Sequence, residues 1–242
     1  MNPTIRVDVI YVIDVFISSF IDPNVKLFFN SPTFTPEIYL MKYLIVFLLF
    51  FFSEVNTAQT ESEMIAEIEA FRASENEKFG SEETTILKPE DLKSFEGLEF
   101  YAINLKLRVE ARFVRTPNEK PFLMPTTTAR LPEYVKYAEA HFVIEGKPFQ
   151  LNLYQNTTPH EDPQYKNHLF LPFTDYTSGD GSYGGGRFID TYIPEGDTIV
   201  IDFNQSYNPY CAYNSVYSCP IPPKENDLKV RVEAGVRDFG KH

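Results

Sequence analysis

The sequence contains no tryptophan, few histidines, and only two cysteines, Cys211 and Cys219, among its 242 residues. It also lacks a cluster of Lys or Arg, and its formal net charge is −12. An acidic protein repels the phosphate backbone, so we expect no nucleic-acid partner. His141, His160 and His168 show no paired spacing, and the two cysteines do not have the spacing of a zinc knuckle. We therefore expect no metal site.

No apolar run is long enough to cross a membrane. Residues 43–52 are apolar throughout, but as a helix they would span about 15 Å, half of the ~30 Å hydrocarbon core. They follow Lys42 and precede a polar stretch that ends at Ala58, which is the pattern of a secretory signal peptide. We expect residues 41–58 to be removed and the product to be exported, periplasmic or secreted, without a membrane span. A short buried core helix is the alternative.

The forty residues before this segment have a different character. Residues 1–40 mix apolar, β-branched runs with prolines and have no basic n-region. They would place the signal peptide inside the chain rather than at its start. We interpret residues 1–40 as a misassigned N-terminal extension, with translation beginning at Met41.

Residues 59–242 are expected to form a single β-rich domain that begins with helices. Thr60 and Glu63 match a capping box at the start of an amphipathic helix, and Gly80 is a natural end for it. A second, short helix is expected from Pro89 to Gly97. The domain boundaries thus follow the end of the predicted signal peptide.

Beyond this point apolar and polar residues alternate, with the period of half-buried strands. Such runs lie at residues 106–114, 135–146, 148–155, 168–173, 187–193, 197–203 and 228–235. Gly146–Pro148 and Glu195–Asp197 are expected to be hairpin turns that join strand pairs. We predict a mainly β fold, an antiparallel sandwich or barrel-like sheet with one or two N-terminal helices.

The stretch SGDGSYGGGR, residues 178–187, contains G-x-G-x-x-G at Gly179, Gly181 and Gly184. This fingerprint binds a dinucleotide when it opens a helix, because the helix amides hold the pyrophosphate. Here an alternating strand follows, and the chain has no H-R-D catalytic loop of a kinase. We therefore expect no nucleotide and no other cofactor.

Two interpretations of this glycine-rich loop stay open. In the first, the loop is a structural turn that Arg187, its only basic residue, holds by pairing with Asp175 or Asp190. In the second, the loop forms a polar pocket for a small anionic or sugar-like ligand. The candidate ligand-binding residues are Asp175, Ser178, Tyr183, Arg187, Asp190, Tyr207 and Asn208.

Cys211 and Cys219 are expected to form a disulfide, because the predicted compartment is oxidising and the chain has no other cysteine. The loop-entropy relation gives such a bond about 2.5 kcal/mol of stability. Metal ligation and a nucleophilic cysteine are the alternatives. Neighbouring tyrosines, Tyr207 and Tyr210 among them, either pack in the core or stack on a sugar ring.

Several motifs carry a resemblance to a known family. The pattern FTDYTSG followed by YGGGR, the segment YNPYCAY with CPIPPKEN, and FEGL at residues 95–98 closely resemble the bacterial and archaeal family called domain of unknown function 1684. The resemblance runs from about Glu61 to Gly235. It implies a single-domain protein without an established activity.

Two functions remain as hypotheses. The first is an exported, non-enzymatic binding or structural module of the cell envelope, with a polar patch at the glycine-rich loop. The second is a hydrolase-like enzyme with Asp175 or Asp190 as general base and Arg187 holding an anion. One cleft that gathers these residues with a histidine or cysteine would favour the enzyme, and pairing beneath the surface would favour the module.

Overall fold

The computed structural model describes residues 61–158 and 163–240. Both stretches lie in one compact unit, Thr60–His242. The predicted signal peptide, residues 41–58, and the predicted extension, residues 1–40, lie outside the described residues. Among the described helices, none is both long and apolar enough to cross a membrane.

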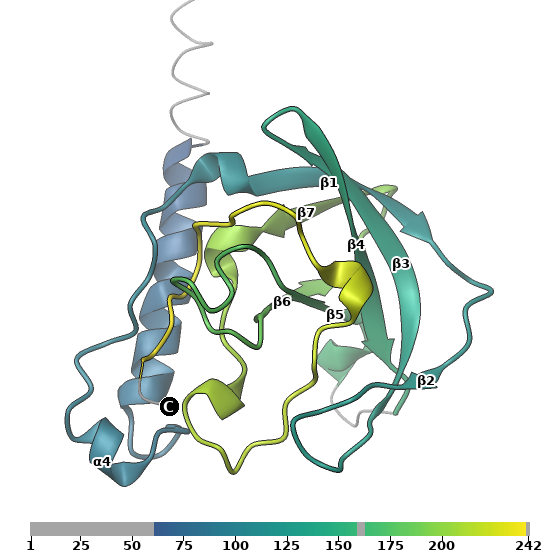
Figure 1. The fold of residues 1–242 in the computed structure, drawn as a ribbon. Helices are drawn as coiled ribbons and strands as arrows, with labels where there is room; N and C mark the ends of the chain where they lie inside the picture. The colour runs from purple at the N-terminus through teal and green to yellow at the C-terminus, as the bar shows by residue number, and fades with distance from the viewer. Residues whose placement is uncertain (1–60, 159–162, 241–242) are drawn as a thin grey trace, which may run out of the picture. The chain divides into compact units, whose positions relative to one another are not determined.

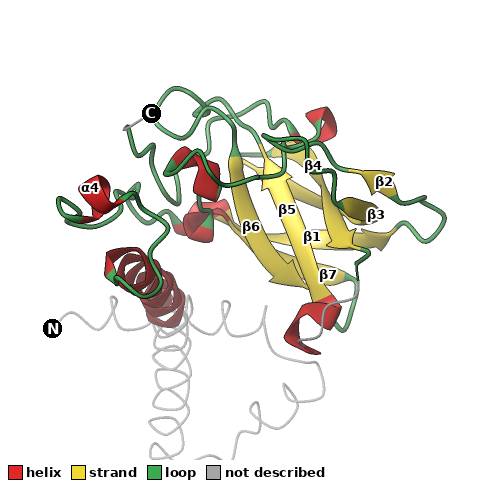
Figure 2. Cartoon of the chain, turned by 90° about the horizontal axis from the view of Figure 1, so that it is seen from below, coloured by secondary structure: helices red, strands yellow, loops and turns green. Residues whose placement is uncertain are grey.

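A curled antiparallel sheet forms the centre of the fold (Figures 1 and 2). Its strands are β1 (Arg108–Arg115), β2 (Phe122–Leu123), β3 (Glu133–Ile144), β4 (Lys147–Asn156), β5 (His168–Phe173), β6 (Arg187–Tyr192) and β7 (Thr198–Asp202). Their order is β6-β5-β4-β3-β1-β7, and β2 pairs with β3. The sheet curls into a half-barrel, which confirms the predicted mainly β, barrel-like fold.

One of the two predicted hairpin turns is formed and the other is not. Gly146 lies in the turn between β3 and β4, which pair along their length, and its φ of 77° suits glycine. Glu195–Asp197 joins β6 to β7, and these strands are the two edges of the sheet. The predicted hairpin is wrong because β6 pairs with β5 while β7 pairs with β1. The turn instead connects the two edge strands of the sheet.

The predicted strand at residues 228–235 is also wrong. The segment is extended, and Leu228, Val232 and Ala234 are buried in the main core, but it contains bends and joins no strand of the sheet. Figure 1 shows it in yellow, beside the loop between β5 and β6. Its carbonyl groups accept hydrogen bonds from the Arg187 side chain instead of from a neighbouring strand. The alternating pattern therefore reflects burial of one side without sheet pairing.

The N-terminal helix covers residues 61–80 and ends at Gly80 as expected. Ile68 and Phe79 are its fully buried side chains. The second helix, α4 (Pro89–Leu92), begins with the predicted proline but ends before Gly97. Short 3-10 helices complete the fold: η1 (Leu105–Leu107), η2 (Pro163–Asn167), η3 (Phe203–Gln205), η4 (Tyr210–Ala212) and η5 (Lys224–Asn226).

Asn226 bridges a gap in the sheet between β4 and β5. The two strands pair directly at Tyr154 and Phe170. Beyond that point the Asn226 side chain takes the place of ladder bonds. Its Oδ1 accepts from Asn152 N at 2.8 Å, and its Nδ2 donates to Asn152 O at 2.9 Å and to Pro172 O at 2.7 Å. A side chain near the C-terminus thus completes the backbone pairing of central strands.

Candidate functional site

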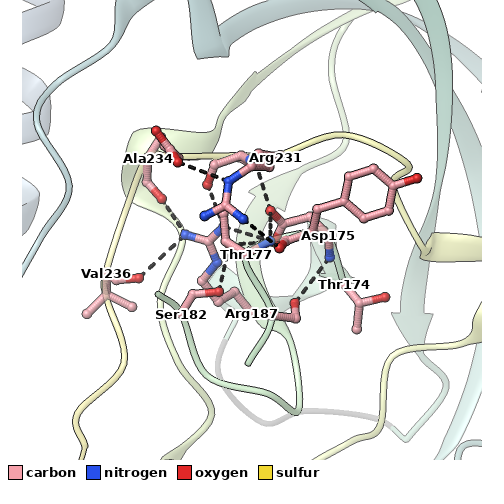
Figure 3. Close-up of polar contacts among 12 residues, drawn as sticks. Thr174, Asp175, Thr177, Ser182, Arg187, Arg231, Ala234 and Val236 are labelled. Atoms are coloured by element: carbon pink, nitrogen blue, oxygen red, sulfur yellow. Dashed lines mark hydrogen bonds and ion pairs between the residues drawn. The ribbon is translucent and has the colours of Figure 1, made fainter. Parts of the chain in front are cut away.

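The glycine-rich loop, residues 174–186, is closed by a buried ion pair (Figure 3). Arg187 is the first residue of β6, and Asp175 follows the end of β5. Nη2 of Arg187 lies 3.1 Å from Oδ1 of Asp175, and neither side chain has exposed surface. The predicted pairing of Arg187 with Asp175 is therefore confirmed.

Asp175 has hydrogen-bond partners on both carboxylate oxygens. Oδ2 accepts from Thr177 N at 3.0 Å and from Val232 N at 2.7 Å. Oδ1 accepts from Thr177 Oγ1 at 3.0 Å in addition to its bond with Arg187. Thr177 Oγ1 in turn lies 2.8 Å from Ser182 Oγ, across the base of the loop. The carboxylate thus organises the loop from within.

Arg187 directs its remaining donors to residues 228–239, which we call the C-terminal segment. Nη2 donates to Val232 O at 2.8 Å, and Nη1 donates to Ala234 O and, at 3.4 Å, to Val236 O. Burial lowers the pKa of Arg187, and the negative charge of Asp175 opposes that shift. Both terminal nitrogens of the Arg187 guanidinium donate hydrogen bonds to protein groups, whereas Nε has no partner. This arrangement is a structural clasp between β5, β6 and the C-terminal segment.

Three of the other candidate residues do not converge with the clasp on one cleft. Ser178 Oγ accepts from Asp175 N at 3.1 Å and fixes the local turn. Tyr183 Oη lies 3.9 Å from Cys211 Sγ. Asn208 is buried, and its Nδ2 donates to Tyr213 Oη at 3.3 Å and to a backbone carbonyl at 2.9 Å.

Asp190 lies on the face of β6 opposite to that of Arg187. Successive residues of a strand point to opposite faces, so positions 187 and 190 are on different sides of the sheet. Asp190 Oδ1 lies 2.8 Å from His168 Nε2, and Tyr207 Oη donates to Asp190 Oδ2 at 2.6 Å. The alternative pairing of Arg187 with Asp190 is therefore wrong.

Asp190 is the centre of a polar and aromatic patch, which we call the Asp190 surface: His168, Asp190, Tyr192 and Tyr207. The Asp190 side chain is 46% exposed and Tyr192 is 54% exposed. The His168 and Tyr192 rings pack edge to face with centroids 6.0 Å apart. Burial raises the pKa of Tyr207 well above 10, and Asp190 adds to that rise, so the phenol stays a proton donor. The patch combines an accessible carboxylate with aromatic side chains.

His168 and Tyr192 were missing from the predicted site residues. They are direct partners in the antiparallel pairing of β5 and β6, and Phe170 is opposite Asp190. Aligning the two predicted strands in opposite directions would have placed His168 within two residues of Asp190 on the same face. The alternation of apolar and polar residues in these two strands therefore contained the signal that His168 and Asp190 lie close together.

Cys211 and Cys219 are free thiols in this structure, and the disulfide stays a prediction. They are nonetheless neighbours, because Cys211 N donates to Cys219 Sγ at 3.2 Å. Within residues 61–158 and 163–240, no three His, Cys, Asp or Glu side chains are grouped as metal ligands. A hollow of about 190 Å³ lies between residues 94–99 and the C-terminal segment, and none of the predicted site residues lines it.

Comparison with known proteins places this fold among uncharacterised relatives. No curated protein matches the sequence. The solution NMR structure of the uncharacterized protein from gene locus rrnAC0354 of Haloarcula marismortui is similar, with a TM-score of 0.60 and 28% sequence identity. The similarity covers 76% of this chain and 99% of that one. Residues 93–237, more than half of the chain, match the family described as protein of unknown function (DUF1684), and the chain belongs to that family.

Proposed function

We propose that this protein is an exported, non-enzymatic binding module of the cell envelope and that the Asp190 surface is its ligand site. One observation carries the binding role: an exposed carboxylate that two protein groups hold in place beside an exposed tyrosine ring. His168 and Tyr207 each bond one oxygen of Asp190. The signal-peptide pattern at residues 41–58 supports export.

The chemistry of this surface favours a neutral, sugar-like ligand over an anion. A carboxylate oxygen has two acceptor sites, so each oxygen of Asp190 can still accept from a ligand hydroxyl. Tyr192 offers an aromatic face on which the apolar side of a sugar ring can pack. An anion would require a free cation, but the guanidinium of Arg187 is enclosed and bonded to Asp175. The Arg187 guanidinium in the clasp is therefore not available to a ligand at the Asp190 surface.

The same geometry argues against the hydrolase hypothesis. That hypothesis requires Arg187 to hold an anion near Asp175 or Asp190 acting as a general base. Arg187 and Asp175 pair beneath the surface, where no substrate reaches them. Asp190 lies on the other face of β6 and contacts His168 and Tyr207 instead. Pairing beneath the surface is the arrangement that favours a module.

Binding can be tested with a panel of neutral mono- and oligosaccharides and with phosphate and sulfate as the anionic arm. Thermal shift identifies a ligand, because a compound that binds the folded state raises its stability. Calorimetric titration then compares the wild type with Asp190→Asn and Tyr192→Ala. Tyr176→Ala is the matched control, since Tyr176 is 55% exposed but lies in the glycine-rich loop.

We expect saccharide binding that weakens about tenfold or more in Asp190→Asn and Tyr192→Ala and stays unchanged in Tyr176→Ala. Binding of phosphate or sulfate alone, or equal effects of all three substitutions, would contradict the proposal. Export is tested separately by the intact mass of the protein from its native host. A product that begins at Gln59 supports export, and a product that retains residues 1–58 contradicts it.

A further inference from the structure

Cys211 and Cys219 lie together in a rigid setting that the Asp190 surface does not use. Cys211 is in η4, and its backbone N donates to Cys219 Sγ at 3.2 Å. The backbone of Cys219 is fixed by Thr127: Cys219 N donates to Thr127 Oγ1 at 3.1 Å, and Thr127 N donates to Cys219 O at 2.9 Å. The two cysteines are thus joined to each other by one hydrogen bond, and Cys219 is fixed by two more to Thr127.

The two thiols differ in access to solvent. Cys219 is buried, with 6% of its surface exposed, whereas Cys211 is half-buried. Tyr183, from the glycine-rich loop, brings its hydroxyl to 3.9 Å from Cys211 Sγ. A tyrosine hydroxyl therefore lies near the accessible thiol, and the second thiol is the more buried of the two. This is the arrangement of an attacking and a resolving thiol.

We propose that Cys211 and Cys219 form a thiol–disulfide exchange pair, in which Cys211 attacks an external disulfide and Cys219 resolves the mixed disulfide. The partner is any solvent-accessible disulfide, of a small thiol or of another protein. The proposal does not rest on the Asp190 surface. It also differs from the prediction of a structural disulfide between Cys211 and Cys219, because such a disulfide would react only slowly with external thiols and disulfides.

The reaction balances without a further reagent. The thiolate of Cys211 attacks one sulfur of a disulfide RSSR′, forms a mixed disulfide with RS and releases R′S⁻. Cys219 then loses its proton to solvent, and its sulfur attacks Cys211 Sγ, which releases RS⁻. The protein gives up two electrons and two protons, and the external disulfide becomes two thiols.

Electrostatics supports the assignment of roles. The hydrogen bond with Cys219 lowers the pKa of Cys211, and Tyr183 contributes to the same shift. The same hydrogen bond and burial raise the pKa of Cys219. The accessible sulfur is therefore the thiolate, and the buried sulfur keeps its proton until the mixed disulfide forms.

The first test uses the reduced, full-chain wild type, so it does not depend on any variant folding. Limiting iodoacetamide is added at neutral pH, and peptide mass spectrometry measures the label on each cysteine. We expect Cys211 to be labelled at least about tenfold faster than Cys219, with the difference lost in concentrated urea. Equal labelling in the folded protein, or faster labelling of Cys219, would overturn the proposal.

The second test uses glutathione disulfide as the probe. We expect the wild type to lose two hydrogens and retain no glutathione, because Cys219 releases it. Cys219→Ser should stop at a glutathione adduct on Cys211, and Cys211→Ser should form no adduct in the same time. Adduct formation at equal rates on both variants would overturn the assignment of the attacking thiol.

A third comparison addresses Tyr183. Tyr183→Phe removes the hydroxyl near Cys211 Sγ, and we expect Cys211 alkylation to slow severalfold. Tyr217→Phe is the matched control, because Tyr217 lies between the two cysteines in the sequence and packs on Tyr210. Equal rates in Tyr183→Phe and the wild type would remove Tyr183 from the exchange site.

Discussion

Nη2 of Arg187 lies 3.1 Å from Oδ1 of Asp175, and both side chains are excluded from solvent. A buried ion pair has a desolvation cost similar to its attraction, so its presence alone adds little stability. Its removal is different, because the remaining partner becomes an unpaired charge in the core. The pair therefore makes the glycine-rich loop and the C-terminal segment depend on each other.

We predict that Arg187→Ala lowers the free energy of unfolding by about 3–5 kcal/mol, because Asp175 and three carbonyl groups lose their donor. Urea unfolding followed by circular dichroism measures the loss. Arg231→Ala is the control, because Arg231 pairs with Asp180 at the surface of the same loop. We expect it to unfold like the wild type. Equal stability of Arg187→Ala and Arg231→Ala would show that the clasp does not hold the fold.

Gly186 is a position in the loop where neighbouring atoms leave no room for a side chain. Its φ is +88°, and a Cβ atom there would lie 2.5 Å from Phe173 O and 2.9 Å from Pro222 Cγ. We predict that Gly186→Ala costs about 1–3 kcal/mol from the left-handed backbone, with the clash adding to that loss. Gly196→Ala serves as the comparison, because no atom lies within 4 Å of its Cβ position. The thermal unfolding midpoint of Gly186→Ala should be clearly lower than that of Gly196→Ala. Similar midpoints would refute the close packing of Gly186.

Asn226→Ala tests the bridge between β4 and β5. It leaves one backbone donor and two backbone acceptors unpaired beside the core, and each costs about 1–3 kcal/mol. We predict a large loss of stability together with faster hydrogen exchange at the Asn152 amide. Gln205→Ala is the control, because that amide makes one long bond of 3.4 Å to Asp202. Unchanged exchange at Asn152 would show that Asn226 does not complete the sheet.

The alkylation rate of Cys211 should depend on pH with a midpoint near 6. The hydrogen bond with Cys219 lowers the pKa of Cys211 to about 6, from about 9 in the absence of neighbours. The thiolate is the reactive form, so the rate stays high above this value and falls as pH drops through it. The groups around Cys211 are Cys219, Thr127 and Tyr183, and Lys78 lies over the neighbouring Tyr210 ring. A midpoint at the value of an ordinary thiol would contradict the shift.

The strands were predictable because their alternation is local, whereas their partners were not. The pattern of residues 187–193 predicts β6 and also separates Arg187 from Asp190, since odd and even positions face opposite sides. Periodicity could therefore have excluded Asp190 as the partner of Arg187. The contacts of Arg187 with Ala234 and Val236 could not be predicted, because every residue has a backbone carbonyl and the sequence does not show which ones accept. The same holds for residues 228–235, whose alternation reports burial but not pairing.

The position of Asn226 and Val232 near the end of the chain has a consequence for synthesis. A ribosome delivers residues from the N-terminus, so β4, β5 and β6 emerge before the segment that joins them. Until that segment arrives, the gap beside Asn152 is open and Arg187 has no carbonyl groups to bond. Early compact states would bury Arg187 with Asp175 but without its carbonyl partners, and they are disfavoured. We therefore expect the domain to fold only after residues 226–236 have left the ribosome, in one late and cooperative step.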